Sequence, residues 1–248
     1  MAAIVLSPAI PPTPSTLSSA ELAKVLDSKD TTFDFYYFKL HTHGATTRAI
    51  LAYVDAQWKN TYASDWVTEK PRTRYGTLPV LYEISADGSK VIEHAEALNI
   101  ELRLARRFDL LGSNSAEESA ITGAFSNTRA LMHRFEDAYF VRKQFRDEEH
   151  DKFINEKLLQ WIRTHEKILS ENGSNGHYVG NQVSLADIKT TVAIEQLLNE
   201  SYTFKGFEDI KLYINASASP NLWKIRETVL GKKSYRSWLE SEAYKTIT

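Results

Sequence analysis

The stretch FYYFKLHTHGATTRAILAYVDAQW, residues 35–58, runs from aromatic residues through a loop with two histidines into a helical pattern. Around its start, over residues 33–38, side chains alternate with the period of two that is expected of a β-strand. After the loop, three apolar residues within 50–54 have helical spacing. The stretch therefore predicts a strand, a loop and a helix, which is half of a βαβ unit.

The composition is that of a globular protein without cysteine. The chain has 248 residues, of which 42% are hydrophobic and 25% charged, enough to bury one large core or two modest ones. Its net charge of −2 provides no strong attraction for nucleic acid or an anionic membrane. No apolar stretch approaches the roughly 20 residues of a membrane span, and the amino terminus lacks the basic region of a secretory signal. We therefore expect a cytoplasmic protein without disulfides, without cysteine metal ligands or a nucleophilic thiol of its own, and without nucleic-acid or membrane partners.

Further strand patterns occur only before residue 110. The apolar core of YGTLPVLYEI, residues 78–81, predicts a strand although a proline stands at its start. SADGSK is typical of a hairpin turn, residues 91–93 predict the next strand, and a helix is expected from residue 94. Beyond residue 115 only helical patterns occur. We therefore predict a flexible N-terminal extension with a possible short helix (1–32), an α/β domain (33–109) and an all-α domain (115–248).

This layout and several spaced residues resemble the cytosolic glutathione transferases, in particular their tyrosine-type, sigma-like members. In those proteins a tyrosine and a phenylalanine end the first strand, and an arginine follows eleven positions after the tyrosine, as here. GNQVSLADI resembles the capping-box segment of the family's second domain. The resemblance spans roughly residues 33–245 and implies a thioredoxin-like N-terminal domain followed by an all-α domain. The matching residues are Tyr37, Phe38, Arg48, Trp66, Lys70 and Gly76, with the TLPVL that follows it.

The two adjacent tyrosines receive different roles. Strand alternation sends Tyr37 and Tyr36 to opposite faces, and Tyr37 stands at the carboxyl edge, where open sheets of this kind bind ligands. From the residues alone, both tyrosines could be core. The resemblance implies that Tyr37 is catalytic, because its hydroxyl would donate a hydrogen bond to the glutathione sulfur and lower the thiol pKa. Tyr36 is then a packing residue.

The resemblance also implies how glutathione would be held. Pro79 resembles the family's cis-proline, which would turn the backbone of Leu78 outward to pair with the cysteinyl part of the tripeptide; an ordinary strand-edge proline is the alternative. Glu93 and His94 would open the next helix, where exposed amides and the helix dipole favour the γ-glutamyl carboxylate and the Glu93 carboxylate would meet the ligand amine. The other matched positions are Trp66 and Lys70 at the glycyl end, Thr77 beside Leu78, and His43, where sigma-like members carry arginine.

For the second substrate, the family builds an apolar pocket between its domains. Helical spacing makes core packing the alternative role for at least half of the corresponding residues here. These residues are Leu40, Met132, Phe135 and Tyr139.

A metal site is the other possible use of the histidines. His41 and His43, with Glu93 and His94 nearby, could supply ligands, but His-x-His on a loop is a weak pattern and the family has no metal there. We expect no metal.

These features predict a glutathione transferase that conjugates glutathione to a hydrophobic electrophile, as in detoxification, or a related glutathione-dependent isomerase or peroxidase. The alternative is a catalytically weak or inactive binding or carrier module with the same fold. The tyrosine, tryptophan, lysine and proline set favours the enzyme, whereas Thr77 and His94 favour the module, because stronger donors are missing there. The resemblance also implies a homodimer.

Overall fold

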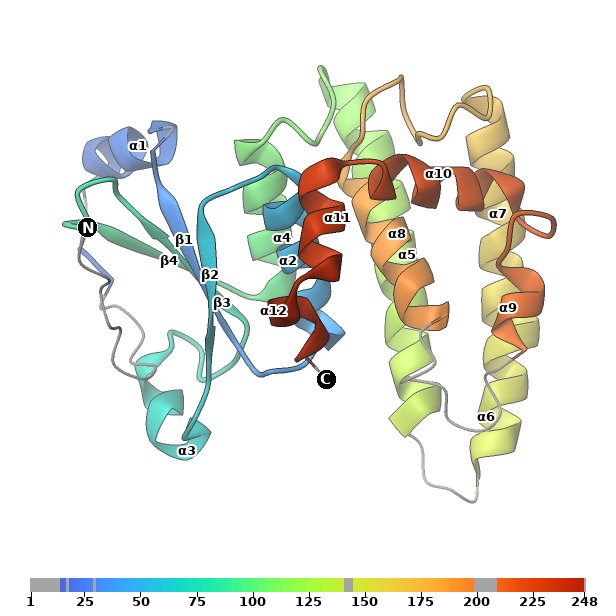
Figure 1. The fold of residues 1–248 in the computed structure, drawn as a ribbon, viewed down its shortest axis with the longest axis horizontal. Coiled ribbons are helices and arrows are strands. Elements are labelled where there is room, and N and C mark those ends of the chain that lie inside the picture. The colour runs from blue at the N-terminus through green and yellow to red at the C-terminus, as the bar shows by residue number, and fades with distance from the viewer. Residues whose placement is uncertain (1–13, 17, 29, 141–144, 199–208, 248) are drawn as a thin grey trace. The chain divides into compact units, whose positions relative to one another are not determined.

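The computed structural model describes residues 14–16, 18–28, 30–140, 145–198 and 209–247 (Figure 1). The chain divides into two compact units, Met1–Phe108 with Ser234–Thr248, and Asp109–Lys233. Of the predicted flexible extension 1–32, residues 1–13, 17 and 29 lie outside the described residues. None of the helices in the described segments has the length and apolarity needed to cross a membrane.

The first unit is built on a mixed four-stranded sheet with the strand order β2-β1-β3-β4. β1 and β2 are parallel, whereas β3 is antiparallel to both β1 and β4. Since the helix α2 (Ala45–Tyr53) joins β1 to β2, the predicted βαβ unit is completed by β2 and not by the strand predicted at residues 78–81. The strands are β1 (Thr32–Tyr37), β2 (Trp58–Tyr62), β3 (Val80–Ile84) and β4 (Val91–Ala95).

β2 is the strand that the residue pattern did not indicate. Its sequence WKNTY places polar side chains between two aromatic ones, and its residues are half-buried or exposed. β2 lies at an edge of the sheet and pairs only with β1. An edge strand does not need the continuous apolar run of a buried strand, so the pattern that would have revealed it is weak.

The two faces of this sheet have different cover. α2 and α4 contact each other on one face, which carries the buried Phe35 and Leu81 (Figure 1). The opposite face carries the buried Tyr36 and Tyr82 and packs against Trp66 of the short helix α3. The helical elements of this unit are α1 (Ser19–Asp27), η1 (Thr42–Gly44), α2 (Ala45–Tyr53), α3 (Trp66–Glu69), η2 (Lys70–Arg72), α4 (Ala97–Arg107), α11 (Lys233–Glu240) and α12 (Glu242–Lys245).

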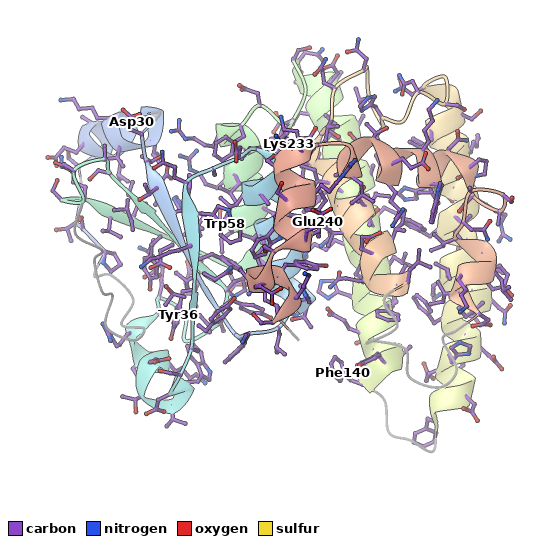
Figure 2. All side chains as sticks on the ribbon, viewed as in Figure 1. Asp30, Tyr36, Trp58, Phe140, Lys233 and Glu240 are labelled. Carbon is purple, nitrogen blue, oxygen red and sulfur yellow. The ribbon has the colours of Figure 1, made fainter. Side chains whose placement is uncertain are left out.

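The C-terminal residues 234–248 belong to this first unit, whereas the predicted domain division placed them in the helical domain. The Ser234 hydroxyl donates a hydrogen bond of 3.0 Å to the carbonyl of Tyr53. Farther along, the Trp238 ring packs 4.9 Å from Trp58, which Figure 2 labels beside α11. The C-terminal helices thus cover the aromatic surface of Trp58 at the β2 edge of the sheet.

The N-terminal extension docks on the other edge of the sheet. Ser15 exchanges two hydrogen bonds with the backbone of Val91 in β4, one from its amide at 2.8 Å and one to its hydroxyl at 3.0 Å. The predicted helix α1 follows, and its capping box between Ser18 and Glu21 is present. Because β4 is an edge strand with unpaired backbone groups, this segment covers a surface that could otherwise pair with another chain.

The second unit is all-helical over its described residues, as predicted. α5 and α8 make the largest contact, around buried side chains such as Phe125 and Ile188. The amide and the hydroxyl of Ser184 both donate to the Asp187 carboxylate at 2.7 Å, which is the side that Asp187 supplies to the predicted capping box. The elements are α5 (Ser115–Phe140), α6 (Arg146–Lys152), the π-helical η4 (Phe153–Leu158), α7 (Leu159–Glu171), α8 (Leu185–Leu198), α9 (Ile210–Tyr213) and α10 (Pro220–Leu230).

Candidate functional site

Tyr37 is the last residue of β1, and its ring lies on the face of the sheet that α2 covers. The side chain is 4% exposed, and its hydroxyl oxygen lies 2.9 Å from Oγ1 of Thr42, where either group can donate. Gly44 makes room for the ring, since a Cβ there would lie 2.7 Å from Cδ1 of the tyrosine. The phenol is therefore held at the carboxyl end of the strand with a polar partner at its oxygen.

Arg48 fixes the loop that follows Tyr37. The guanidinium is buried and donates to the carbonyls of Leu40 at 2.6 Å and Phe38 at 3.1 Å, and to Oδ1 of Asn60 in β2 at 2.8 Å. Its carbon also lies 5.7 Å from the centre of the Tyr37 ring, in cation–π geometry. The eleven-residue spacing between tyrosine and arginine thus reflects a structural need: one planar donor group holds two loop carbonyls and the neighbouring strand.

The residues expected at the glycyl end of glutathione lie near the end of β1. Phe38 packs against the Tyr37 ring on one side and against Trp66 on the other, with ring centroids 5.6 Å apart in each case. Lys70 passes over Gly76, where the backbone has φ +63° and a Cβ would lie 3.3 Å from Cε of the lysine. The structure thereby places Trp66 beside the end of β1 and Lys70 beside the loop that leads to Pro79.

The Leu78–Pro79 peptide bond is cis, which confirms the prediction. Leu78 precedes β3 and is half-buried. Among the described residues, its backbone amide and carbonyl have no hydrogen-bond partner. A donor and an acceptor are therefore available for an extended peptide at this point.

The prediction that Glu93 and His94 open a helix is wrong, because both residues lie within β4. They pair with Tyr82 and Leu81 of β3, and the ladder continues to Ala95. The strand extends this far because all five residues of β3 find partners in β4. The carboxylate of Glu93 accepts from the backbone amide of Arg74 at 3.2 Å and lies 3.6 Å from Nε of the same arginine.

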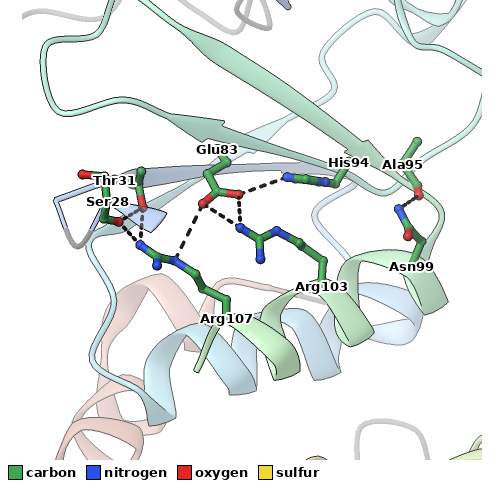
Figure 3. A network of polar contacts seen from close by, with 8 residues as sticks. All are labelled: Ser28, Thr31, Glu83, His94, Ala95, Asn99, Arg103 and Arg107. Atoms are coloured by element: carbon green, nitrogen blue, oxygen red, sulfur yellow. Dashed lines mark hydrogen bonds and ion pairs between the residues drawn. The ribbon is translucent and has the colours of Figure 1, made fainter. Parts of the chain in front are cut away.

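His94 takes part in a buried ionic network on the α4 face of the sheet (Figure 3). Its Nε2 lies 3.1 Å from the carboxylate of Glu83, which is fully buried. The same carboxylate accepts from Arg103 at 3.1 Å and pairs with Arg107, which also donates to the carbonyl of Ser28. His94 therefore helps to join β4, α4 and the segment after α1, and its imidazole is not directed at the start of the helix.

The residue before α4 is Glu96, which the sequence reading missed. It is the N-cap, with φ 72° and ψ 123°, a backbone conformation that costs a non-glycine residue about 1–3 kcal/mol. Its exposed carboxylate accepts a hydrogen bond of 3.1 Å from the hydroxyl of Thr77, one residue before Leu78. Glu96 at the start of α4 and the open backbone of Leu78 thus lie at the same end of the β3–β4 pair, joined by the Thr77–Glu96 hydrogen bond.

The loop histidines have separate surroundings. His41 is buried and packs against Tyr244 of α12, with tilted rings whose centroids are 4.7 Å apart. Burial, and then the charge of Arg48, lower the pKa of His41 to about 4. His43 lies exposed in η1, so its role toward glutathione stays a prediction. Since His94 is bonded to Glu83, the side chains of His41 and His94 have different partners.

The residues expected around the second substrate are divided between the two units. Leu40 is 41% exposed in the first unit. In the second, Met132 and Phe135 of α5 are buried, and the Phe135 ring packs 5.5 Å from Phe153, as the core alternative expects. Tyr139 is half-buried beside Phe135.

Comparisons with known proteins agree with this architecture. Residues 130–242 match the family model described as glutathione S-transferase, C-terminal domain. The chain is 26% identical over 198 residues to glutathione S-transferase 1 of Ascaris suum, which covers 76% of this chain and 92% of the relative. It is 33% identical over 129 residues to the glutathione S-transferase of Dirofilaria immitis, covering 50% of this chain and 55% of the relative. The sigma class transferase structure of Fasciola hepatica has a TM-score of 0.71 at 18% identity, covering 89% of this chain and 98% of the other.

Proposed function

Because the chain belongs to the glutathione S-transferase family, we propose that it is a glutathione transferase in which Tyr37 activates the thiol of glutathione. The observation that carries this proposal is the position of the Tyr37 hydroxyl at the carboxyl end of β1, with a polar partner, in the same unit as the open backbone of Leu78. The second substrate would be a hydrophobic electrophile. Glutathione is the co-substrate, and the mechanism needs no metal.

The chemistry follows from one hydrogen bond. The Tyr37 hydroxyl would donate to the sulfur, and since this bond favours the anion, the thiol pKa falls and more thiolate exists near neutral pH. The Thr42 hydroxyl, 2.9 Å away, can donate to the phenol oxygen and so leave the phenol proton directed at sulfur. The thiolate attacks an electrophilic carbon, a sulfur–carbon bond forms, and the displaced electron pair leaves with the leaving group or moves into the electrophile. Isomerisation and peroxide reduction would start from the same thiolate.

The remaining groups would hold the tripeptide. Leu78 would pair with the cysteinyl backbone as an added strand does, and Trp66 and Lys70 would contact the glycyl end, with Lys70 as the counter-charge. The first amides of α4 would receive the γ-glutamyl carboxylate. We assign the contact with the ligand amine to Glu96, because Glu93 is bonded to Arg74.

The second candidate is a binding module without turnover, and the observation that favours it is the 4% exposure of Tyr37. Two measurements separate the candidates. Glutathione at 100 times its dissociation constant should stabilise the folded protein by about 2.7 kcal/mol, and turnover of 1-chloro-2,4-dinitrobenzene should depend on Tyr37. Stabilisation without turnover supports the module, and the absence of both refutes the enzyme.

A matched pair of variants tests the mechanism. Tyr37→Phe should raise the pKa of the bound thiol by about 1–2 units, because a hydrogen bond to a charged group contributes about 1.5–3 kcal/mol. Tyr36→Phe should leave that pKa unchanged. Equal effects would mean that the wrong tyrosine has been assigned to the sulfur. We expect the enzyme to act in the cytoplasm as a two-fold homodimer.

A further inference from the structure

Tyr36 lies on the opposite face of β1 from Tyr37 and is more than a packing residue. Its side chain is fully buried, and its hydroxyl donates a hydrogen bond of 2.6 Å to Oε2 of Glu69. The same oxygen accepts from the backbone amide of Ser64 at 3.2 Å, and Oε1 accepts from the Ser64 hydroxyl at 2.9 Å. One buried carboxylate thus receives three donors, two of them from the turn before α3.

Near neutral pH, Tyr36 stays protonated and Glu69 stays ionised, so this hydrogen-bonded contact keeps its donor and its acceptor. Burial and the hydrogen bond to Glu69 raise the pKa of Tyr36, so the phenol keeps its proton and remains the donor. For Glu69, burial acts to raise the pKa, but the hydrogen bonds from Tyr36 and Ser64 outweigh it and the pKa is lowered. An ionised, buried carboxylate is tolerated only when its oxygens have donors, so the loss of one donor should disturb the whole contact.

The position of the contact gives it a consequence. Ser64 precedes the short helix α3, which begins at Trp66 and ends at Glu69, and Lys70 follows directly. A four-residue helix has too few internal hydrogen bonds to be stable alone. Figure 2 labels Tyr36 in the part of the sheet nearest α3. Through Glu69, the Tyr36 hydroxyl therefore ties the turn before α3 and the last residue of this helix, next to Lys70, to β1.

We propose that Tyr36 and Glu69 are a positioning pair that sets the affinity of the site for the glycyl end of its peptide ligand. This inference rests on the proposed function, because it takes glutathione as the ligand and Trp66 and Lys70 as its glycyl contacts. Tyr36 touches no substrate atom; it acts through α3. The two tyrosines of one strand then serve the same ligand from opposite faces, Tyr37 at the sulfur and Tyr36 through the segment that binds the other end.

Two probes that differ only at the glycyl end test the proposal. Glutathione and γ-glutamylcysteine, which lacks the glycine, are titrated separately into the wild-type protein and into Tyr36→Phe by calorimetry. We expect the wild type to bind glutathione more tightly. In Tyr36→Phe, glutathione should bind about threefold to tenfold more weakly, the loss of one buried hydrogen bond, while the affinity for γ-glutamylcysteine and the pKa of the bound thiol stay unchanged.

Tyr82→Phe is the matched control, since Tyr82 is an equally buried tyrosine on the same face of the sheet. It should leave the ratio of the two affinities at the wild-type value. Glu69→Gln should also keep the ratio, because an amide can accept from Tyr36 and donate to the Ser64 hydroxyl, whereas Glu69→Leu should lower it. If Tyr36→Phe does not fold, Ser64→Ala removes one donor at an exposed residue and should lower the ratio about twofold to threefold.

The possible failures are distinct. An unchanged ratio in folded Tyr36→Phe or in Ser64→Ala overturns the positioning role, as does an equal loss in Tyr82→Phe. A loss of affinity for both probes in equal measure means that the variant damages the whole site and also overturns it. A wild-type protein that binds neither probe refutes the proposed function itself, and with it this inference.

Discussion

Arg48→Met should strongly destabilise the first unit. The wild-type guanidinium donates to three oxygens, the carbonyls of Leu40 and Phe38 and the side chain of Asn60. A buried acceptor left without a donor costs about 1–3 kcal/mol. The two carbonyls lie in a loop of which Leu40 is 41% exposed, so water can reach part of it and the lower value applies. Three acceptors at about 1 kcal/mol each give a loss of about 3 kcal/mol.

Smaller effects do not change this estimate much. Methionine keeps an unbranched stem against the rings of Phe35 and Tyr37, so little packing is lost. The cation–π contacts with those rings disappear, which adds about 0.5–1 kcal/mol. We therefore expect a free energy of unfolding about 3.5–4 kcal/mol below the wild-type value.

Urea unfolding measures this loss as a lower transition midpoint with an unchanged slope. Arg226→Met is the matched control, because Arg226 is partly exposed, pairs with Glu195 and stacks on Trp223 in the second unit. That variant should lose only about 1 kcal/mol. If Arg48→Met costs no more than Arg226→Met, the arginine does not hold the loop, and the spacing between Tyr37 and Arg48 needs another explanation.

Three further predictions concern other parts of the chain. Burial lowers the pKa of His165 to about 4, so in acid the unfolded chain binds a proton that the folded chain does not. The contribution of His165 to the free energy of unfolding should be constant above about pH 6.5 and fall by up to about 3 kcal/mol as the pH approaches 4. His165→Gln should make this slope shallower in urea melts and leave the part due to His41, whose pKa is also lowered to about 4, and an unchanged slope would contradict the assignment. Deletion of residues 1–30 removes Ser15 from β4 and should cause concentration-dependent association in light scattering, whereas deletion of 1–13 keeps Ser15 and should not. Glu96→Gly should raise the free energy of unfolding by about 1 kcal/mol, because glycine adopts φ 72° without strain. The same variant should bind glutathione more weakly in calorimetry; if both the stability and the glutathione affinity increase, Glu96 does not contact the ligand.

Local chemistry made part of this fold predictable from the sequence. The first strand and the helix after it follow from residue spacing within a dozen positions, and the structure has them as β1 and α2. The capping box of Ser18 and Glu21 is also a local signal, and it is present. The cis form of Pro79 was expected from the resemblance to thioredoxin-like folds and not from the residues. For the strand, the helix and the capping box, the neighbours that decide the conformation are close in the sequence.

Features decided by distant neighbours were missed. The C-terminal helices cover Trp58 and His41, which precede Trp238 and Tyr244 by 180 and 203 positions, and nothing in the local pattern of the last fifteen residues indicates these contacts. Tyr36 is similar, because the partner of its hydroxyl lies 33 residues away in a polar stretch without a strand or helix signal of its own. A lone buried tyrosine in a strand predicts packing; only the position of Glu69 reveals the second role.

The start of α4 illustrates a competition that the sequence alone does not decide. EHAEALNIELRLARR has good helix formers from Glu93 onward, so helical propensity favours an early start. The chain nevertheless stays in a strand as far as Ala95, because each residue of β4 pairs with a residue of β3 and His94 bonds to the buried carboxylate of Glu83. The transition must then occur within one residue, which forces Glu96 into a left-handed conformation. That conformation puts a carboxylate, bonded to Thr77, at the N-cap of the helix. The strand pairing that was not predicted from the sequence therefore also positions Glu96 for the role toward the ligand amine that the sequence analysis gave to Glu93.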